Sequence, residues 1–152
     1  DVILGNEEDF DAMLGIQADH TDEDFSNIDP ENYRKVAEKV LTKYPHIVAV
    51  GTSLREVKTA CLNNWQTCLM TKNGFFVSRK YEDIEILDRV GGGDSFASAL
   101  IWGMLEGHPE QEVVDYAAAY SALCHTIRND WNLVTREEAY ALANGGSARV
   151  KR

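Results

Sequence analysis

Along the first third of the chain, short apolar runs alternate with segments whose apolar residues are spaced as on one face of a helix. Residues 2–4 (VIL) and 46–51 (HIVAVG) are short apolar runs typical of buried strands. Between them, the spacing of apolar and polar residues predicts a helix over residues 7–14 and a second helix that begins at Asp29-Pro30 and ends near Tyr44. The order strand, helix, strand favours a parallel crossover unit, because two parallel strands need a long connection between them.

Short β segments occupy the middle of the chain and helices occupy the last third. Asn73-Gly74 predicts a tight turn between two strands, and Thr135 with Glu138 three residues later has the capping-box pattern of a helix start. The predicted strands are 57–62, 66–71, 74–78 and 84–87, and the predicted helices are 94–105, 109–127 and one that starts at Thr135. Because no repeat or linker interrupts this pattern, we expect residues 1–152 to lie in one α/β domain.

Composition narrows the range of partners. The 152 residues carry a formal net charge of −10 and have a pI near 4.8, which disfavours nucleic acid and anionic membranes, because both attract basic patches. No apolar run reaches the length of a membrane span. The three cysteines include no CxxC pair, which favours a reduced, cytoplasmic compartment. The chain opens directly on a strand and without methionine, so we expect it to be part of a longer protein.

The stretch DRVGGGDSFAS (88–98) is the strongest candidate for chemistry. A strand that runs into glycines and then into a helix can bind an anion, because the first N–H groups of the helix lack internal partners and the helix dipole is positive there. Asp94 at the start of this helix could accept a proton from an attacking hydroxyl group. The alternative is purely structural, with Asp94 as the N-cap of the helix and the glycines as a tight turn.

Two other catalytic motifs fit this stretch poorly. A dinucleotide fingerprint GxGxxG that began at Gly91 would need a glycine where the chain has Phe96. The sequence GDS at 93–95 is typical of a class of serine esterases, with Ser95 as the nucleophile. However, no histidine in the chain follows an aspartate at the DxxH spacing, and the GxSxG elbow is absent.

The same stretch resembles a family signature. DRVGGGDSFASALIWGML (88–105) is similar to the motif D-T-x-G-A-G-D-x-F of ribokinase-like (PfkB-type) carbohydrate kinases. GNEED (5–9) resembles the N-x-x-E motif of that family, and VAVGTSLRE (48–56) resembles its strand and turn that reach the nucleotide. SALCHTIRNDWNLVTREE (121–138) resembles the closing segment of one branch, the 2-keto-3-deoxygluconate kinases.

The resemblance implies a fold and an activity. The expected fold is an α/β sandwich with a mostly parallel sheet flanked by helices, present here only as the C-terminal part of a single kinase domain. The sugar-binding strands and the lid of such kinases would lie upstream. The expected reaction is transfer of the γ-phosphate of ATP to a primary hydroxyl of a sugar acid, 2-keto-3-deoxygluconate, in the presence of Mg²⁺. A homo-oligomer of the full-length protein stays open.

The resemblance also assigns roles to the glycine stretch. Asp94 corresponds to the general base, and the backbone N–H groups of Gly91, Gly92 and Gly93 correspond to the anion hole for the migrating phosphoryl group. Asp88 corresponds to a residue that helps to order a monovalent cation such as K⁺, although an aspartate there could equally cap the end of its strand.

Other residues are assigned to the nucleotide and its metal ion. Thr52, Ser53 and Arg55, together with Gly91 and Gly93, would contact ATP, although Ser and Thr are also common in turns. Asn6 and Asp9 would orient the waters of Mg²⁺, which usually keeps several waters, although the same pair could be a simple helix cap.

The chain departs from the family pattern at several positions. Gly92 stands for the middle Ala of G-A-G-D, and Arg89 stands for the Thr after the first Asp. Arg89 could bind a phosphate or an acidic substrate, or it could be a solvated surface residue. Asp9 is one methylene shorter than the family's Glu, and Glu8 beside it is an alternative contact for the waters of the metal. The helix over 109–127 lacks the Asn that some members place against adenine, so the base contacts stay unassigned.

Several prominent side chains are interpreted as structural. Phe75 and Phe76 should point to opposite faces of a strand, and His125 should be a favourable charge at a helix end. The residues assigned to the core or to helix packing are Phe96, Leu100, Trp102 and Met104.

Three alternatives to the proposed kinase remain. The first is another sugar kinase of the same family, of the fructokinase or ribokinase type. The second is a nucleotide-binding module without turnover, and the third is the serine esterase with Ser95 as its nucleophile.

Overall fold

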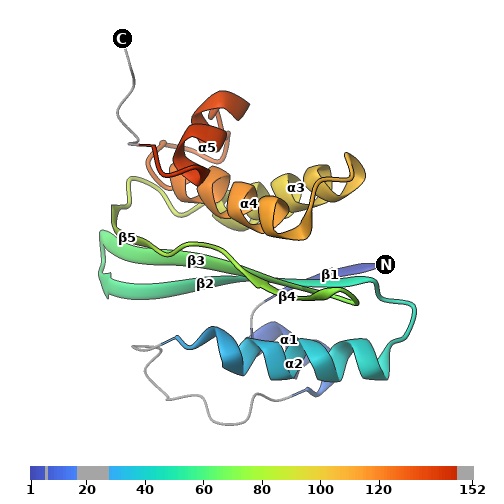
Figure 1. The fold of residues 1–152 in the computed structure, drawn as a ribbon. Helices are drawn as coiled ribbons and strands as arrows, with labels where there is room; N and C mark the ends of the chain where they lie inside the picture. Colours follow the sequence, from blue (N-terminus) through green and yellow to red (C-terminus); the bar gives the residue numbers. More distant parts are fainter. Residues whose placement is uncertain (6, 17–27, 147–152) are drawn as a thin grey trace.

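A computed structural model describes residues 1–5, 7–16 and 28–146 of the chain. The strands are β1 (Val2–Leu4), β2 (Ala49–Thr59), β3 (Leu62–Thr71), β4 (Gly74–Val77) and β5 (Tyr81–Glu85). The helices are α1 (Glu7–Leu14), α2 (Pro30–Lys43), α3 (Gly92–Leu105), α4 (Glu110–Cys124) and α5 (Arg136–Ala143). Helices cover both faces of one sheet, with α1 and α2 on one face and α3, α4 and α5 on the other (Figure 1). The predicted α/β class is therefore confirmed.

The sheet is mixed, which differs from the mostly parallel sheet that the family resemblance implied. β1 pairs with β2 in parallel, as the strand, helix, strand order predicted, whereas β2–β3, β3–β4 and β3–β5 are all antiparallel. The cause is the length of the connections. Only two residues separate β2 from β3 and β3 from β4, and a parallel pair needs a crossover of a dozen or more residues.

The strand boundaries also differ from the prediction in the middle of the chain. β2 runs through Thr52–Arg55, which the sequence places in a turn, and it ends in a hairpin turn at residues 60–61. The predicted strands 57–62 and 66–71 therefore become the end of β2 and one long strand, β3. The sequence does not predict this turn, because residues 60–61 include neither glycine nor proline, the residues that mark most tight turns.

Each face of the sheet has its own apolar core. Under α3, α4 and α5, the core includes Phe96, Leu100 and Val114, with Phe76, Trp102 and Met104 packed against it. Under α1 and α2, it includes Phe10, Val36 and Val50, and Phe75 packs on this side. The predicted core positions and the opposite orientations of the two phenylalanines are confirmed.

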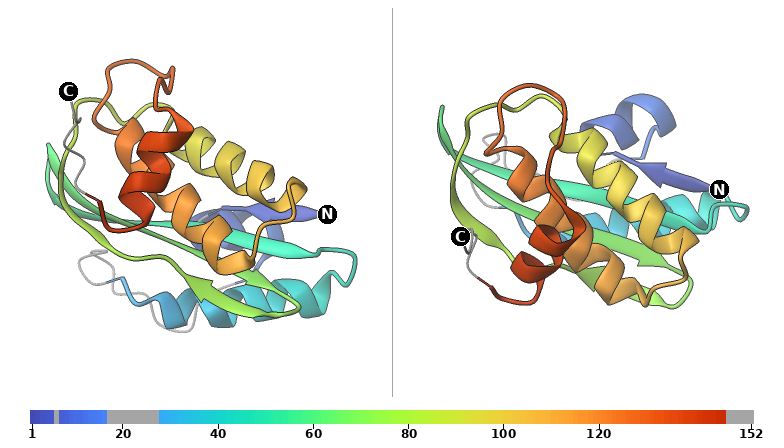
Figure 2. Two further views of the ribbon diagram at one scale, coloured as in Figure 1. Left: turned by 45° about the horizontal axis from the view of Figure 1, so that its top comes forward. Right: turned by 90° about the horizontal axis from the view of Figure 1, so that it is seen from above.

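The helices on the α3 side position the glycine stretch. Figure 2 shows α3 and α4 side by side above the sheet, with α5 beyond α4. α3 packs on β2 at Gly51, where a Cβ atom would lie 2.9 Å from Leu100 Cδ1 of α3 and 2.7 Å from Leu4 Cδ2 of β1. The absence of a side chain at Gly51 therefore lets the leucines of β1 and α3 pack directly on the backbone of β2.

Local capping signals define two of the other helices as predicted. The Asp29 carboxylate accepts a hydrogen bond of 3.0 Å from the backbone N–H of Glu31 at the start of α2. Thr135 and Glu138 form a complete capping box at the start of α5.

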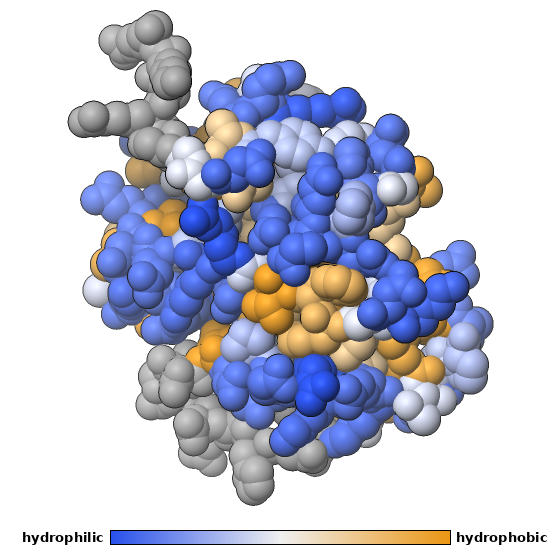
Figure 3. Space-filling view, viewed as in Figure 1, coloured by the Kyte–Doolittle hydropathy of each residue, from blue (hydrophilic) through white to orange (hydrophobic). Residues whose placement is uncertain are grey.

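The surface is mostly polar on the face that Figure 3 shows, with apolar side chains gathered over β4. All four residues of β4 are half-buried. Within the described part of the chain, no helix is both long enough and apolar enough to cross a membrane.

Candidate active site

The first turn of α3 is built on glycine. Gly91 is the N-cap and has a φ of 82°, in the left-handed region, and a Cβ atom there would lie 2.9 Å from the backbone oxygen of Asp130. The backbone N–H of Ser95 donates to the Gly91 carbonyl at 2.8 Å. The first hydrogen bond of the helix is therefore donated by Ser95. The N–H groups of Gly92, Gly93 and Asp94 come before it and have no acceptor within the helix. Together with the helix dipole they form a site that attracts an anion.

Asp94 lies in the third position of α3 and is exposed. Because Gly91 occupies the cap position, the interpretation of Asp94 as a simple N-cap is wrong. A carboxylate within the first helical turn is favoured by the dipole, and this one lies beside free backbone donors with access to solvent. It can therefore accept a proton from a hydroxyl group that approaches the same donors.

The two glycines that follow Gly91 face different surroundings. A Cβ atom on Gly92 would lie 2.6 Å from His125 Nε2, so this glycine is packed against a ring. A Cβ atom on Gly93 would meet nothing within 4 Å. A ligand can thus approach the backbone at Gly93, while the backbone at Gly92 is held by the protein.

Asp88 braces the loop that leads into the glycines. Its Oδ1 accepts a hydrogen bond from the N–H of Val90 and its Oδ2 accepts one from the N–H of Asn129, both at 3.1 Å. These bonds, the one from Val90 first, lower the pKa of the Asp88 carboxyl below its ordinary value. The carboxylate joins the glycine loop to the loop after α4, a structural role close to the cap that the sequence left open.

The β2 residues predicted to contact the nucleotide lie on two faces of the sheet. Thr52 is 3% exposed and pairs with Cys68 on β3. Burial raises the pKa of the Cys68 thiol to about 12, against the opposing effect of a hydrogen bond with the Thr52 side chain. Cys68 packs with Tyr33 of α2, so the side chain of Thr52 faces the layer opposite α3 and is separated from Asp94 by the sheet.

Ser53 and Arg55 alternate with Thr52 and therefore face the α3 and α4 side. Arg55 is exposed and pairs with Trp65, whose Nε1–H donates to Ser121 Oγ of α4 at 2.8 Å. Burial is the main cause that lowers the pKa of the His125 ring at the end of α4, and the positive charge of nearby Arg55 lowers it further. The structure therefore groups Arg55 with the glycine stretch and leaves Thr52 apart from it.

Arg89 lies at the edge of the same group. Its Nη2–H donates to the backbone oxygen of Ala60 at 2.7 Å, which ties the glycine loop to the turn between β2 and β3. Its charge also contributes to the lowered pKa of His125. The side chain of Arg89 is exposed, as a solvated surface residue would be, and its charge nevertheless lies near His125.

The structure places His125 differently from the prediction. It was interpreted as a charge at a helix end, but its side chain is buried, with 3% exposure. Burial lowers the pKa of the ring below its ordinary value, although the hydrogen bond with the Ser121 carbonyl opposes this shift. The interpretation as a charge is therefore wrong, because desolvation favours the neutral ring. No local signal in the sequence predicts that the His125 ring packs against Gly92, because the two residues meet only in the tertiary structure.

Asn6 and Asp9 are the two residues predicted to orient the waters of the metal ion. Asn6 lies outside the described residues. Asp9 is exposed and lies over Gly5, where an added Cβ atom would be 3.0 Å from Asp9 Cβ. Gly5 N–H donates to the Gly51 carbonyl at 3.2 Å, which extends the parallel pair of β1 and β2 to this point. Asp9 thus follows the carboxyl end of β1, where open α/β sheets usually bind ligands.

Ser95 is unsuited to the role of an esterase nucleophile. It is 5% exposed, and its Oγ accepts a hydrogen bond of 3.0 Å from Asn132 Nδ2. Asn132, the partner of this hydroxyl, is an amide and cannot act as the general base that an esterase serine needs. The structure therefore argues against the esterase alternative.

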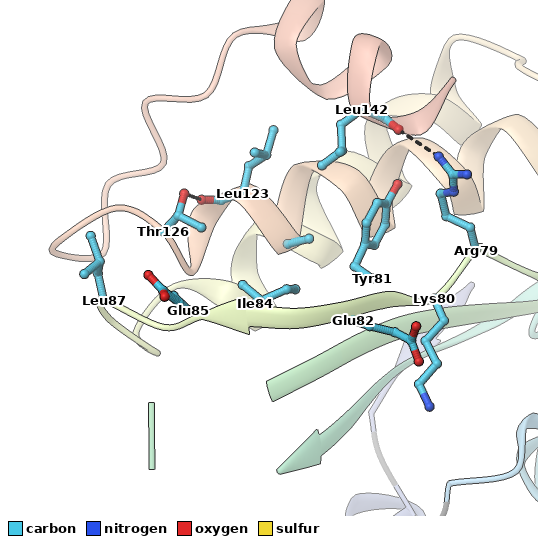
Figure 4. A pocket seen from close by; sticks show the side chains of 11 residues that line it. Arg79, Lys80, Tyr81, Glu82, Ile84, Glu85, Leu87, Leu123, Thr126 and Leu142 are labelled. Atoms are coloured by element: carbon cyan, nitrogen blue, oxygen red, sulfur yellow. Dashed lines mark hydrogen bonds between the residues drawn. The ribbon is translucent and has the colours of Figure 1, made fainter. Parts of the chain in front are cut away.

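A cleft of about 510 Å³ lies between β5 and the helices α4 and α5 (Figure 4). Leu87, Glu85 and Thr126 lie at one end, and Tyr81 and Arg79 lie at the other, where Arg79 Nη1 donates to the Leu142 carbonyl at 3.4 Å. Among the described residues, none of those predicted for the site lines this cleft. The candidate active site is therefore the first turn of α3 and not this cleft.

Known proteins share this architecture. Residues 1–132 match the family model of the pfkB family carbohydrate kinases. The structure of 2-dehydro-3-deoxygluconokinase from Thermotoga maritima is 42% identical, with a TM-score of 0.86 over 95% of this chain and 42% of that protein. A 5-dehydro-2-deoxygluconokinase from Clostridium perfringens is 29% identical over 81% of this chain and 30% of its own length. A 2-dehydro-3-deoxygalactonokinase from Haloferax volcanii is 31% identical over 46% of this chain and 22% of its own length.

The chain spans less than half the length of these relatives. The match nevertheless includes the glycine stretch, Asp88 and Asp94, which are the residues gathered at the first turn of α3. The chain belongs to the pfkB family of carbohydrate kinases.

Proposed function

We propose that the protein containing this chain is an ATP-dependent kinase that phosphorylates a primary hydroxyl of 2-keto-3-deoxygluconate. The observation that carries the proposal is the exposed carboxylate of Asp94 in the first turn of α3, beside the free N–H groups of Gly92 and Gly93. A proton acceptor and anion donors at one point are what phosphoryl transfer to an alcohol requires.

In the proposed reaction, Asp94 takes the proton of the sugar hydroxyl as its oxygen forms a bond to the γ-phosphorus. The bond between that phosphorus and the β–γ bridging oxygen breaks, and ADP leaves with the electron pair. The N–H groups of the α3 turn hold the negative charge that is transferred. Removing one such donor typically costs about 10²–10³-fold in kcat.

Positive charge near the turn supports the binding of a triphosphate. The chain as a whole carries a net charge of −10, so ATP must be held by local cations and backbone donors. Arg55 and Arg89 supply these cations, since both are close enough to His125 to lower its pKa. Ser53 lies on the same face of β2 as Arg55 and is a further candidate contact.

The metal ions that the resemblance implies would each meet a carboxylate of this chain. Mg²⁺ would neutralise charge on the phosphates, and the exposed Asp9 carboxylate in the first turn of α1, which follows β1, suits a water-mediated contact with it. Asn6 would act with Asp9. A monovalent cation such as K⁺ would lie near Asp88, whose lowered pKa keeps it ionised.

The choice of substrate rests on the relatives. The three proteins named above are described as kinases of 2-dehydro-3-deoxygluconate, 5-dehydro-2-deoxygluconate and 2-dehydro-3-deoxygalactonate type. All three names indicate a sugar acid or sugar that has lost one hydroxyl and gained a carbonyl. This favours a keto-deoxy substrate over fructose or ribose. We also propose a cytoplasmic location, which the three free cysteines suit.

A coupled assay of ATP conversion to ADP tests the proposal in the protein that contains this chain. The panel is 2-keto-3-deoxygluconate, fructose, ribose and gluconate, each with native protein and with Asp94→Asn. Turnover of the keto-deoxy acid alone, lost in the variant, is the expected result. Turnover of another sugar would replace the substrate and keep the mechanism. Nucleotide binding without Asp94-dependent turnover would favour the binding-module alternative.

A further inference from the structure

His125 lies against the first turn of α3 from within the protein. A Cβ atom on Gly92 would be 2.6 Å from Nε2 and 2.8 Å from Cε1 of the ring. Gly92 is buried as well. The ring edge is therefore in direct contact with the backbone that begins the anion site, and it leaves room there for glycine only.

The orientation of this ring is determined by contacts on its far side. Nδ1 lies 2.7 Å from the Ser121 carbonyl, and since a carbonyl can only accept, Nδ1 carries the hydrogen. The Trp65 ring meets the imidazole at an angle of 61°, with 4.5 Å between the ring centroids. Trp65 Nε1–H in turn donates to Ser121 Oγ at 2.8 Å. All three side chains are buried, so the ring has one available orientation.

The backbone of the same residue contacts the other end of the glycine loop. The His125 carbonyl accepts a hydrogen bond of 2.8 Å from the N–H of Leu87, and the N–H of Asp88 lies 3.4 Å from it. One residue therefore contacts the loop both where it leaves the last strand and where it enters α3.

We propose that His125 is a positioning residue that sets the place of Gly92 and thereby the direction of the free N–H groups at the start of α3. This inference rests on the proposed function, because those N–H groups matter only if they bind a phosphoryl group. The ring acts through its shape. Its burial, with the nearby charges of Arg55 and Arg89, favours the neutral form, which adds no cation below the positive end of the helix.

A double-mutant cycle tests the contact in the protein that contains this chain. The variants are Gly92→Ala, His125→Ala and the pair together, and the readouts are kcat, KM for ATP and Tm. With the ring present, we expect Gly92→Ala to lower kcat/KM for ATP about 100-fold, as displacement of a site by about 1 Å can do. Without the ring, the same alanine should cost at least tenfold less, because the coupling of contacting residues is lost.

Two further variants separate positioning from a general loss of stability. His125→Asn keeps a donor for the Ser121 carbonyl and removes the ring atoms that touch Gly92, so it should match His125→Ala in KM for ATP. His108→Ala is the matched control. This half-buried histidine follows the far end of α3, 5.3 Å from the Trp102 ring and 3.3 Å from Glu112. We expect it to leave kcat/KM for ATP within about twofold.

The outcomes distinguish the inference from the proposed function. An active native protein in which Gly92→Ala costs the same factor with and without the ring would overturn the role of His125 alone. So would a His125→Ala variant that loses Tm but keeps the native KM and kcat. A native protein without ATP turnover would overturn the proposed function, and the positioning role would fall with it.

Discussion

Gly93→Ala should separate the stability of the α3 turn from its chemistry. A Cβ atom at this position meets nothing within 4 Å, and Gly93 is not among the glycines with a positive φ. The folded protein can therefore accept the methyl group without strain. Since alanine restricts the unfolded chain more than glycine does, the substitution should leave stability unchanged or raise it by up to about 1 kcal/mol.

The same methyl group would stand in the space from which a phosphate must approach the helix start. If the N–H of Gly93 is a donor to the migrating phosphoryl group, blocking it should lower kcat/KM for ATP by about 10²–10³-fold, or about 2.7–4 kcal/mol in transition-state stabilisation. Gly93→Ala should thus keep or raise the free energy of unfolding while it lowers kcat/KM for ATP.

The assay is steady-state ATP turnover together with urea unfolding on the same preparations. Gly103→Ala provides the opposite signature, because a Cβ atom there would lie 3.0 Å from Val113 Cγ2 in the packed contact of α3 with α4. It should lose about 1–3 kcal/mol of stability while its kinetics at saturating substrate change little. Native kinetics in Gly93→Ala would refute the reasoning, because they would mean that the phosphate does not approach the backbone at this position.

Three further variants test the surroundings of the site. Ser121→Ala leaves the Nε1–H of the buried Trp65 without its 2.8 Å acceptor, so urea unfolding should show a loss of about 1–3 kcal/mol; an unchanged midpoint would mean that the hydrogen bond contributes nothing. Asp88 has a lowered pKa in the folded protein, so its contribution to stability is present above its ordinary pKa of 3.8 and is lost as the pH falls through the folded value. The stability difference between native protein and Asp88→Asn should therefore narrow on acidification, and a difference independent of pH would contradict the bracing role. Thr135→Ala removes the capping box of α5 and should cost about 0.5–2 kcal/mol in thermal unfolding, whereas Glu137→Gln, outside the box, serves as its control.

Local signals in the sequence identified much of the fold and the centre of the site. Asp29-Pro30, the capping box at Thr135 and the glycines before Asp94 each act within a few residues of themselves. Their structures follow from backbone geometry and from hydrogen bonds to the nearest N–H groups. Such signals do not depend on how distant parts of the chain pack, and for that reason they could be interpreted from the sequence alone.

The pairing of strands and the faces of β2 were decided by the tertiary structure. The hairpin between β2 and β3 fixes a register in which Thr52 lies opposite Cys68 and Arg55 lies opposite Trp65. Because side chains alternate along a strand, this register directs Thr52 to the α2 layer and Arg55 to the α4 layer. The sequence marks both residues as polar neighbours and carries no local sign of which one faces the site.

The burial of His125 has the same origin. In sequence it is one polar residue after the apolar stripe of α4, where a charge would be favourable. In the structure, three distant segments meet around it, namely Trp65 from β3, Leu87 after β5 and Gly92 at the start of α3. The sequence by itself determined that three glycines and a carboxylate stand at the start of α3, the candidate site. Only the packing of these segments decided which side chain supports that site, because desolvation and close contact depend on the whole fold.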